Sequence, residues 1–161
     1  MKIGIDLDEC LAEFIFGFLN YYNNKYKTNF EFKDFKHYDL WKTIGGNRES
    51  AVKEVYDFYD TSHFKNLPVI FLSRTSINEL KKDNGLFVIT SRQNDFIEKT
   101  DYWINQNFPN KISDIIFTGE WNNNGPKTKK SDICDRLEID MFIEDNLDNA
   151  LSCAKESRKV L

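Results

Sequence analysis

Near its start the chain reads Lys2-Ile3-Gly4-Ile5-Asp6-Leu7-Asp8-Glu9, a short apolar run that passes directly into acidic residues. Unbroken apolar runs of this length predict strands that are buried on both faces of a sheet. Further runs of this kind lie at residues 86–89, 115–118 and 141–143. The sequence therefore predicts at least four buried strands.

The segments between these strands carry apolar residues at intervals of three and four, which is typical of amphipathic helices. Helices are expected at residues 11–26, 48–60, 74–82, 96–108, 131–137 and 147–154. Asn47 is the expected N-cap of the second helix. Strands that alternate with helices indicate an α/β fold, a Rossmann-like parallel sheet sandwiched by helices. Lys159-Val160-Leu161 could begin a final strand, and the chain stops there.

The spacing of the strand ends predicts an insertion after the first strand. Asp8 and Thr90 are 82 positions apart, whereas a whole strand–helix–strand unit needs only about 30 residues. Thr90 and Lys130 are 40 positions apart, which is enough for one helix and one strand. We therefore expect a core of residues 1–13 and 76–161, with residues 14–75 as the inserted segment.

Composition excludes several classes of protein. The chain has 22 basic and 26 acidic residues, a net charge of −4, and Lys127–Lys130 as its only dense basic run. A polymeric nucleic acid needs a basic face, so it is not an expected partner. Three scattered cysteines and two histidines favour a reducing compartment and argue against a typical zinc enzyme. No apolar run approaches 18 residues and no secretory signal pattern is present, so we expect a cytoplasmic protein without a membrane partner.

Chemically reactive side chains follow three of the expected strands. Asp6-Leu7-Asp8-Glu9, Thr90-Ser91-Arg92 and Glu144-Asp145-Asn146 would meet at one edge of a parallel sheet, where ligands bind in such folds. Each group taken alone is also typical of an ordinary turn. Together they place five carboxylates at one edge, and such clustered charges favour a divalent cation, of which Mg²⁺ suits hard oxygen ligands best.

Four motifs in this order resemble those of the haloacid dehalogenase (HAD) superfamily. Residues 3–9 look like its first motif, hhhhDxDx, and Ile89-Thr90-Ser91 look like its second. Lys130 resembles the third motif, although Lys127 and Lys129 compete with it, and residues 142–146 resemble the acidic fourth. The details DLDExL, TSR and KSDIC…LxIDxFIEDN are most similar to the 5′(3′)-deoxyribonucleotidase branch.

The resemblance implies that residues 14–75 form a helical cap of the first insertion type, which would hang over the strand ends. Relatives usually continue past the last helix into a further strand. Because the chain ends at Leu161, this pattern leaves the fifth strand and the completeness of the chain open.

The resemblance also implies roles for the acidic residues. Asp6 would be the nucleophile that forms an aspartyl-phosphate, and Asp8 the general acid and then base. Residues two apart on an extended strand point the same way, so both could face one phosphate. Asp6, the Asp8 carbonyl and Asp145 would bind Mg²⁺, with Glu144 supporting them directly or through water.

The remaining motif residues would bind the phosphate. Thr90 would donate to a phosphate oxygen with help from the Ser91 amide, and Lys130 would neutralise charge. Trp41 and Phe35, in an irregular stretch, are candidates for stacking on a base. Arg92 is expected to contact phosphate or cap, or to form a surface ion pair.

We therefore expect a Mg²⁺-dependent phosphomonoester hydrolase, a 5′(3′)-nucleotidase acting on nucleoside monophosphates. Two alternatives stay open: a phosphatase for a sugar phosphate or other small metabolite, and a weakly catalytic protein that binds a phosphate ligand. A response-regulator receiver does not explain the long insertion after the first strand. A cysteine phosphatase needs a Cys-x5-Arg motif, which the chain lacks.

Overall fold

The computed structural model describes residues 1–121 and 126–161 and contains a five-stranded parallel sheet. Its strand order is β3-β2-β1-β4-β5. The strands are β1 (Lys2–Ile5), β2 (Gly85–Thr90), β3 (Asp114–Phe117), β4 (Met141–Ile143) and β5 (Lys159–Val160). The predicted α/β fold with a parallel sheet is confirmed.

Eight α-helices and two short 3₁₀ helices accompany the strands within the described residues. The α-helices are α1 (Phe14–Tyr26), α2 (Trp41–Ile44), α3 (Arg48–Tyr59), α4 (Ser62–Lys65), α5 (Ser73–Leu80), α6 (Ile97–Asn107), α7 (Lys130–Arg136) and α8 (Leu147–Cys153). The 3₁₀ helices are η1 (Phe32–Asp34) and η2 (Asn94–Phe96). None of the helices in this part of the chain combines the length and the apolar composition that a membrane crossing requires.

The first helix begins three residues later than its apolar spacing predicts. The amides of Leu11 and Ala12 both donate to the carbonyl of Leu7, and Glu9 has a φ of 60°. Residues 7–12 therefore form a tight turn and not the first turn of the helix. Leu7 and Leu11 are buried and lie four residues apart, as in a helix, although the backbone between them is not helical. This turn fixes the backbone that follows Asp6.

The chain divides into two compact units, one of residues 1–12 with 69–161 and the other of residues 13–68. The first unit contains the sheet and is called the core unit below. The second, the helical insertion, contains α1 to α4. The second boundary lies at Pro68–Val69, so residues 69–75 belong to the core unit, whereas the sequence analysis expected the insertion to extend to residue 75.

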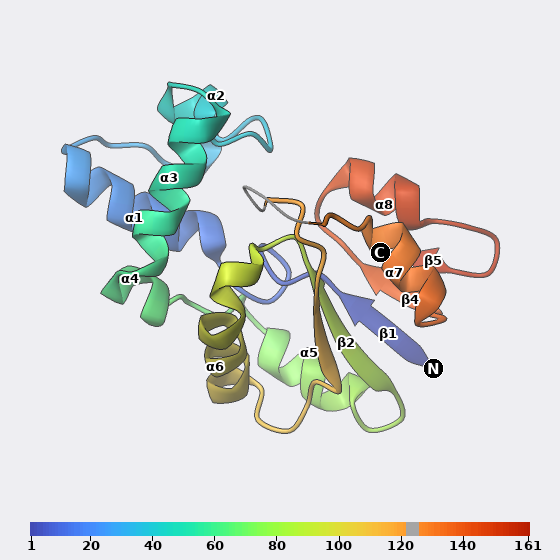
Figure 1. Ribbon diagram of the computed structural model, residues 1–161. Coiled ribbons are helices and arrows are strands. Elements are labelled where there is room, and N and C mark those ends of the chain that lie inside the picture. Colours follow the sequence, from blue (N-terminus) through green and yellow to red (C-terminus); the bar gives the residue numbers. More distant parts are fainter. Residues whose placement is uncertain (122–125) are drawn as a thin grey trace. The chain divides into compact units, whose positions relative to one another are not determined.

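In the core unit, right-handed crossovers explain where the helices lie (Figure 1). The chain passes from β1 through β2 to β3 in one direction, which puts α5 and α6 on one face of the sheet. It then returns past β1 to β4 and β5, which puts α7 and α8 on the opposite face. The first and fourth strands thus become neighbours, with Ile3 opposite Met141 and Ile5 opposite Ile143.

The core on the α7 and α8 face is tightly packed. Its buried side chains are Ile89, Ile133, Cys134, Ile139, Phe142 and Cys153. Gly4 lies on the same face, and a Cβ at this position would be 2.9 Å from Cδ2 of Phe142. Only glycine therefore lets β1 pass this close to the Phe142 ring.

The short fifth strand, β5, pairs with β4 in parallel. The Leu161 amide donates to the carbonyl of Phe142 (2.9 Å), and the Glu144 amide donates to the carbonyl of Leu161 (3.0 Å). The last residues of the chain therefore hold the backbone of Glu144, one of the acidic residues expected in the site.

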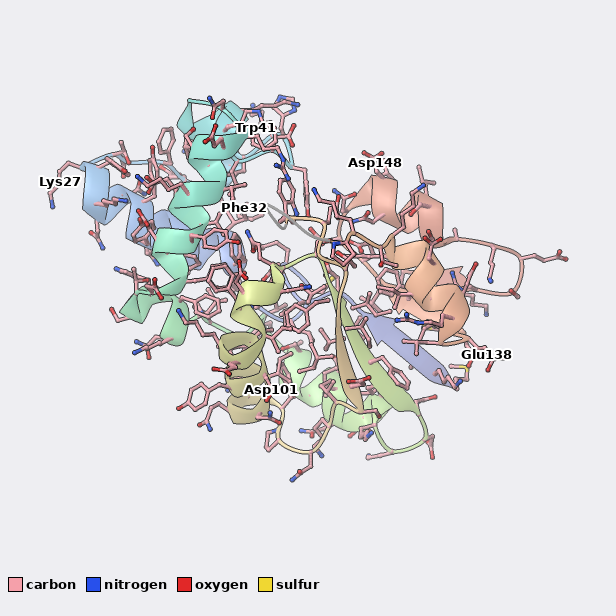
Figure 2. All side chains as sticks on the ribbon, in the orientation of Figure 1. Lys27, Phe32, Trp41, Asp101, Glu138 and Asp148 are labelled. Carbon is pink, nitrogen blue, oxygen red and sulfur yellow. The ribbon has the colours of Figure 1, made fainter. Side chains whose placement is uncertain are left out.

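The helical insertion has an aromatic core of its own. Phe18 and Phe58 are fully buried, with ring centroids 5.7 Å apart and rings nearly perpendicular. Asn47 caps α3 as predicted, because its side chain accepts from the Ser50 amide. The stretch that looked irregular in the sequence holds η1 and α2, and Figure 2 shows Trp41 on α2.

Candidate active site

Asp6 lies directly beyond the end of β1, where the hydrogen bonds to β4 continue. Its amide donates to the carbonyl of Ile143 (2.8 Å), so Asp6 and Glu144 follow neighbouring strand ends. Asp6 is 7% exposed, and its Oδ1 accepts from the Leu7 amide (2.8 Å). The central strands thus carry a buried carboxylate at the carboxyl edge of the sheet.

Lys130, the first residue of α7, lies between two acidic residues. Its Nζ is 2.8 Å from Oδ2 of Asp6 and 2.7 Å from Oε2 of Glu144. Lys130 is buried, whereas Lys127 and Lys129 are exposed. The structure therefore selects Lys130 among the three candidates of the lysine run.

Asp145 adds a third carboxylate. Oxygen atoms of Asp6, Glu144 and Asp145, named here the carboxylate cluster, lie within 4.8 Å of one another. Glu144 is held at both oxygens, because Oε2 accepts from Lys130 and Oε1 accepts from the amide of Asn146 (3.0 Å). Three carboxylates against one ammonium group leave an excess of negative charge.

Burial raises the pKa of Asp6 to about 7. The ammonium group of Lys130 opposes this shift without cancelling it, and the negative charge of Glu144 adds to it. Desolvation also raises the pKa of Asp145 to about 6, with the charge of Asp6 as the next cause, although Asp145 as a whole residue is exposed. Burial alone would lower the pKa of Lys130, but the charges of Asp6 and Glu144 raise it above its ordinary value.

The donor set of the carboxylate cluster fits a hard divalent cation. All of its ligand atoms are carboxylate oxygens, which Mg²⁺ prefers to nitrogen or sulfur. A bound divalent cation would offset the excess negative charge, and it would favour the ionised form of Asp6. The residues present therefore fit the expected Mg²⁺.

Asp8 is not one of the three residues of the carboxylate cluster, and its carboxylate is paired with Arg92. The guanidinium group of Arg92 binds both of its oxygens, with Nε 3.0 Å from Oδ2 and Nη2 2.5 Å from Oδ1. Arg92 is only 3% exposed, and its Nη1 donates to Oγ1 of Thr100 in α6 (3.2 Å). The sequence suggested that Arg92 contacts phosphate or cap, or forms a surface ion pair; Arg92 does form an ion pair, but it is buried and not on the surface.

Thr90 and Ser91 end the neighbouring strand, β2. Thr90 is 1% exposed, and its Oγ1 accepts from the amide of Arg92 (3.2 Å). Ser91 donates its hydroxyl hydrogen to Oε2 of Glu120 (2.8 Å). The side chain of Ser91 is therefore engaged with Glu120, and the backbone amide remains its expected phosphate contact.

Two partners in this site were missed by the sequence analysis. Thr100 occupies a position on the apolar face of its helix, and a buried hydroxyl at such a position indicates a polar partner. Glu120 follows β3 after Thr118 and Gly119, and nothing in its spacing marks it. Trp41 and Phe35 are half-buried residues of the helical insertion, the compact unit that does not contain the sheet.

The sequence of the chain matches the model of a known protein family. Residues 1–151 match the family model described as 5′ nucleotidase, deoxy (pyrimidine), cytosolic type C protein. The chain belongs to this family. A member of this family is a hydrolase, so the prediction of a phosphatase of the nucleotidase type is confirmed.

Relatives of known sequence lie at low identity across almost the whole chain. A nucleotidase of Clostridium acetobutylicum is 27% identical over 165 residues, which cover 100% of this chain and 79% of the relative. A 5′(3′)-deoxyribonucleotidase of Bacillus subtilis is 26% identical over 162 residues, covering 99% of this chain and 83% of the relative.

Solved structures support the HAD fold of this nucleotidase family member. A haloacid dehalogenase-like hydrolase of Streptococcus pneumoniae superposes with a TM-score of 0.69 at 13% identity, covering 94% of this chain and 79% of that one. A HAD hydrolase of Bacillus subtilis, solved bound to magnesium, superposes with a TM-score of 0.57 at 14% identity, covering 96% and 84%. These likenesses confirm the expected HAD-like fold.

Proposed function

We propose that this protein hydrolyses nucleoside monophosphates through an aspartyl-phosphate formed on Asp6. The observation that carries the proposal is the buried Asp6 carboxylate held by Lys130, 2.8 Å away, at the carboxyl edge of the sheet. A carboxylate in this place can act as a nucleophile if its charge is maintained and its position fixed. Lys130 and the Leu7 amide fix its position, and Lys130 together with a bound cation would favour its ionised form.

In the first step, an oxygen of Asp6 attacks phosphorus and the bond from phosphorus to the substrate oxygen breaks. Asp8 gives its proton to the departing alkoxide, which leaves as the nucleoside. In the second step, Asp8 takes a proton from water as the water attacks phosphorus, and the bond to Asp6 breaks. The products are inorganic phosphate and a nucleoside, and both aspartates return to their starting states.

The phosphate would be held by three groups of the core unit. Oγ1 of Thr90 accepts a hydrogen bond from the Arg92 amide, and the same hydroxyl can still donate its hydrogen to a phosphate oxygen. The Ser91 amide would donate a second bond. Lys130 would offset the charge that spreads over the equatorial oxygens during transfer.

Asp6, Asp145 and the Asp8 carbonyl would hold Mg²⁺, with Glu144 in support. When bound, the ion would supply positive charge to the transferring phosphoryl group. The donor set of the carboxylate cluster and the magnesium bound to the similar HAD hydrolase of Bacillus subtilis support this assignment.

For the substrate, we propose a 5′- or 3′-deoxyribonucleoside monophosphate in the cytoplasm. The family description and the relatives named 5′(3′)-deoxyribonucleotidase support this choice. We propose further that the helical insertion acts as a cap, with Trp41 and Phe35 contacting the base. An aromatic ring that stacks on a base contributes about 1–3 kcal/mol.

A panel of phosphomonoesters assayed with purified protein and Mg²⁺ tests this proposal. Phosphate release from dUMP or dTMP well above release from sugar phosphates is the expected result. Preferred release from a sugar phosphate would support a metabolite phosphatase, and the absence of release from every substrate would support a phosphate-binding protein.

A further inference from the structure

Arg92 is built into the core unit so that its guanidinium group reaches one carboxylate. It follows β2 by two residues, its amide donates to Oγ1 of Thr90, and its Nη1 donates to Oγ1 of Thr100. The backbone is thus tied to a strand end, and the side chain to α6. Its side chain is 2% exposed, whereas that of Asp8 is 27% exposed. The arginine is the fixed partner of this pair.

The contact with Asp8 has the geometry of a bidentate pair. Nε and Nη2 each donate to a different oxygen of the carboxylate, at 3.0 and 2.5 Å. Such a fork fixes the orientation of the carboxylate plane, which a single lysine ammonium cannot do. Asp8 lies in the turn of residues 7–12, outside the strand, so its side chain depends on this contact for a defined direction.

We propose that Arg92 is a positioning residue for Asp8, holding its carboxyl group where it exchanges protons with the leaving oxygen and with water. This inference rests on the proposed function. It replaces the substrate contact that the sequence suggested for Arg92. Thr100 supports the arrangement, because it anchors the third nitrogen of the guanidinium group.

A second buried arginine shows what a purely structural pair looks like in this chain. Arg158 donates to the carbonyls of Ile139 and Cys153 and to Oδ1 of Asp135. Its side chain is also 2% exposed, yet its carboxylate partner is 57% exposed and lies in α7. Arg158 therefore joins β5 to the segments around it, and it is a matched control for Arg92.

The test compares two substrates that differ in their need for a proton. A nucleoside monophosphate loses a basic alkoxide that requires protonation, whereas p-nitrophenyl phosphate loses a stable phenolate. The value of kcat/KM covers the steps up to release of the leaving group, so it excludes the later hydrolysis of the aspartyl-phosphate, in which Asp8 acts as a base. A positioning role must therefore lower kcat/KM for the nucleotide more than for the aryl ester.

For R92K we expect kcat/KM for the nucleotide to fall about 10- to 100-fold, with a much smaller fall for p-nitrophenyl phosphate. D8N should show the same selectivity, and R92K added to D8N should change the ratio of the two substrates no further. T100V should shift the ratio in the same direction by a smaller factor. R158K should leave the ratio unchanged, whatever it does to the melting temperature.

Equal falls for both substrates in R92K and T100V would overturn the positioning role, because they would show a general loss of structure. If the double variant R92K/D8N showed the full effect of both substitutions on the ratio of the two kcat/KM values, the positioning role would be overturned as well. A wild-type protein that releases phosphate from neither substrate would overturn the proposed function and this inference with it.

Discussion

The ammonium nitrogen of Lys130 lies 2.8 Å from Oδ2 of Asp6, and the same atom lies 2.7 Å from Oε2 of Glu144. One cation thus joins the ends of β1 and β4. All three side chains are buried, so the loss of Lys130 should change both the stability of the fold and the reactivity of Asp6.

D6N should abolish turnover and leave the fold intact. The amide has the shape of the carboxylate but lacks the charge that attacks phosphorus. Phosphate release and far-ultraviolet circular dichroism measure the two expectations. Retention of more than a few per cent of the wild-type activity would show that Asp6 is not the nucleophile.

K130M should lower the free energy of unfolding at pH 8 by about 3–5 kcal/mol, because it leaves two buried carboxylates without their cation. Urea unfolding in the presence of a chelator measures this. K129M is the matched control, since Lys129 is exposed; its free energy of unfolding should stay within about 0.5 kcal/mol of the wild type. Equal stabilities of both variants would contradict the pairing.

In the metal-free protein, the part of the stability that comes from the raised pKa of Asp6 should fall as pH rises from about 4 to about 7. The pKa of Asp6 is raised from 3.8 to about 7 by burial, so the folded state binds its proton more tightly than the unfolded chain does. The stabilisation is therefore complete below pH 3.8 and is lost as pH rises through 7. Urea unfolding at a series of pH values, with chelator, measures the slope.

In D6N this slope should flatten by up to about 1.4 kcal/mol per pH unit, since the titrating group is gone. Excess Mg²⁺ should stabilise the wild type more at pH 8 than at pH 6, because protons compete with the cation for the carboxylate. Identical slopes in the two proteins would contradict the raised pKa.

D145A should raise the Mg²⁺ concentration required for half-maximal activity. Asp145 belongs to the carboxylate cluster, and its loss removes one candidate ligand. D148A is the control, because Asp148 is an exposed acid in the first turn of α8 that lies outside the cluster (Figure 2). Activity that survives a strong chelator would show that the metal assignment is wrong.

W41A should raise KM for nucleotides about 5- to 150-fold, the range that corresponds to one stacked base. KM for p-nitrophenyl phosphate should change far less. F32A is the control within the same segment, because Phe32 is 61% exposed and lies in η1 (Figure 2). Equal changes for both substrates in W41A would identify Trp41 as a packing residue.

The sequence predicted those features that depend on local patterns. Residues 86–89 and 141–143 are apolar runs and form β2 and β4, because strands buried on both faces need apolar side chains throughout. Asn47 was predicted as a cap from its place before a helical pattern, and it is one. The acidic residues at the ends of β1 and β4 were expected to meet, since parallel strands end at one edge.

Features that depend on distant contacts could not be predicted in this way. The choice of Lys130 over Lys127 and Lys129 follows from burial against Asp6, 124 positions earlier in the chain. The pairing of Arg92 with Asp8 joins residues 84 positions apart. The helix α1 starts three residues later than predicted because the amides of Leu11 and Ala12 bond to the Leu7 carbonyl in a turn. The spacing of apolar residues is the same in such a turn as in a helix, so the sequence alone could not distinguish the two.

The central position of β1 has a consequence for the order of folding. It precedes β2 to β5 in the sequence, yet Lys2 pairs with Gly85 and Ile3 pairs with Met141. Both partners thus emerge from the ribosome long after β1, and contacts of such high sequence separation form slowly. Until residues 141–146 have been made, Asp6 has no Glu144 or Asp145 beside it. In a nascent chain the helical insertion is therefore complete before residues 141–146 supply the remaining acids of the carboxylate cluster.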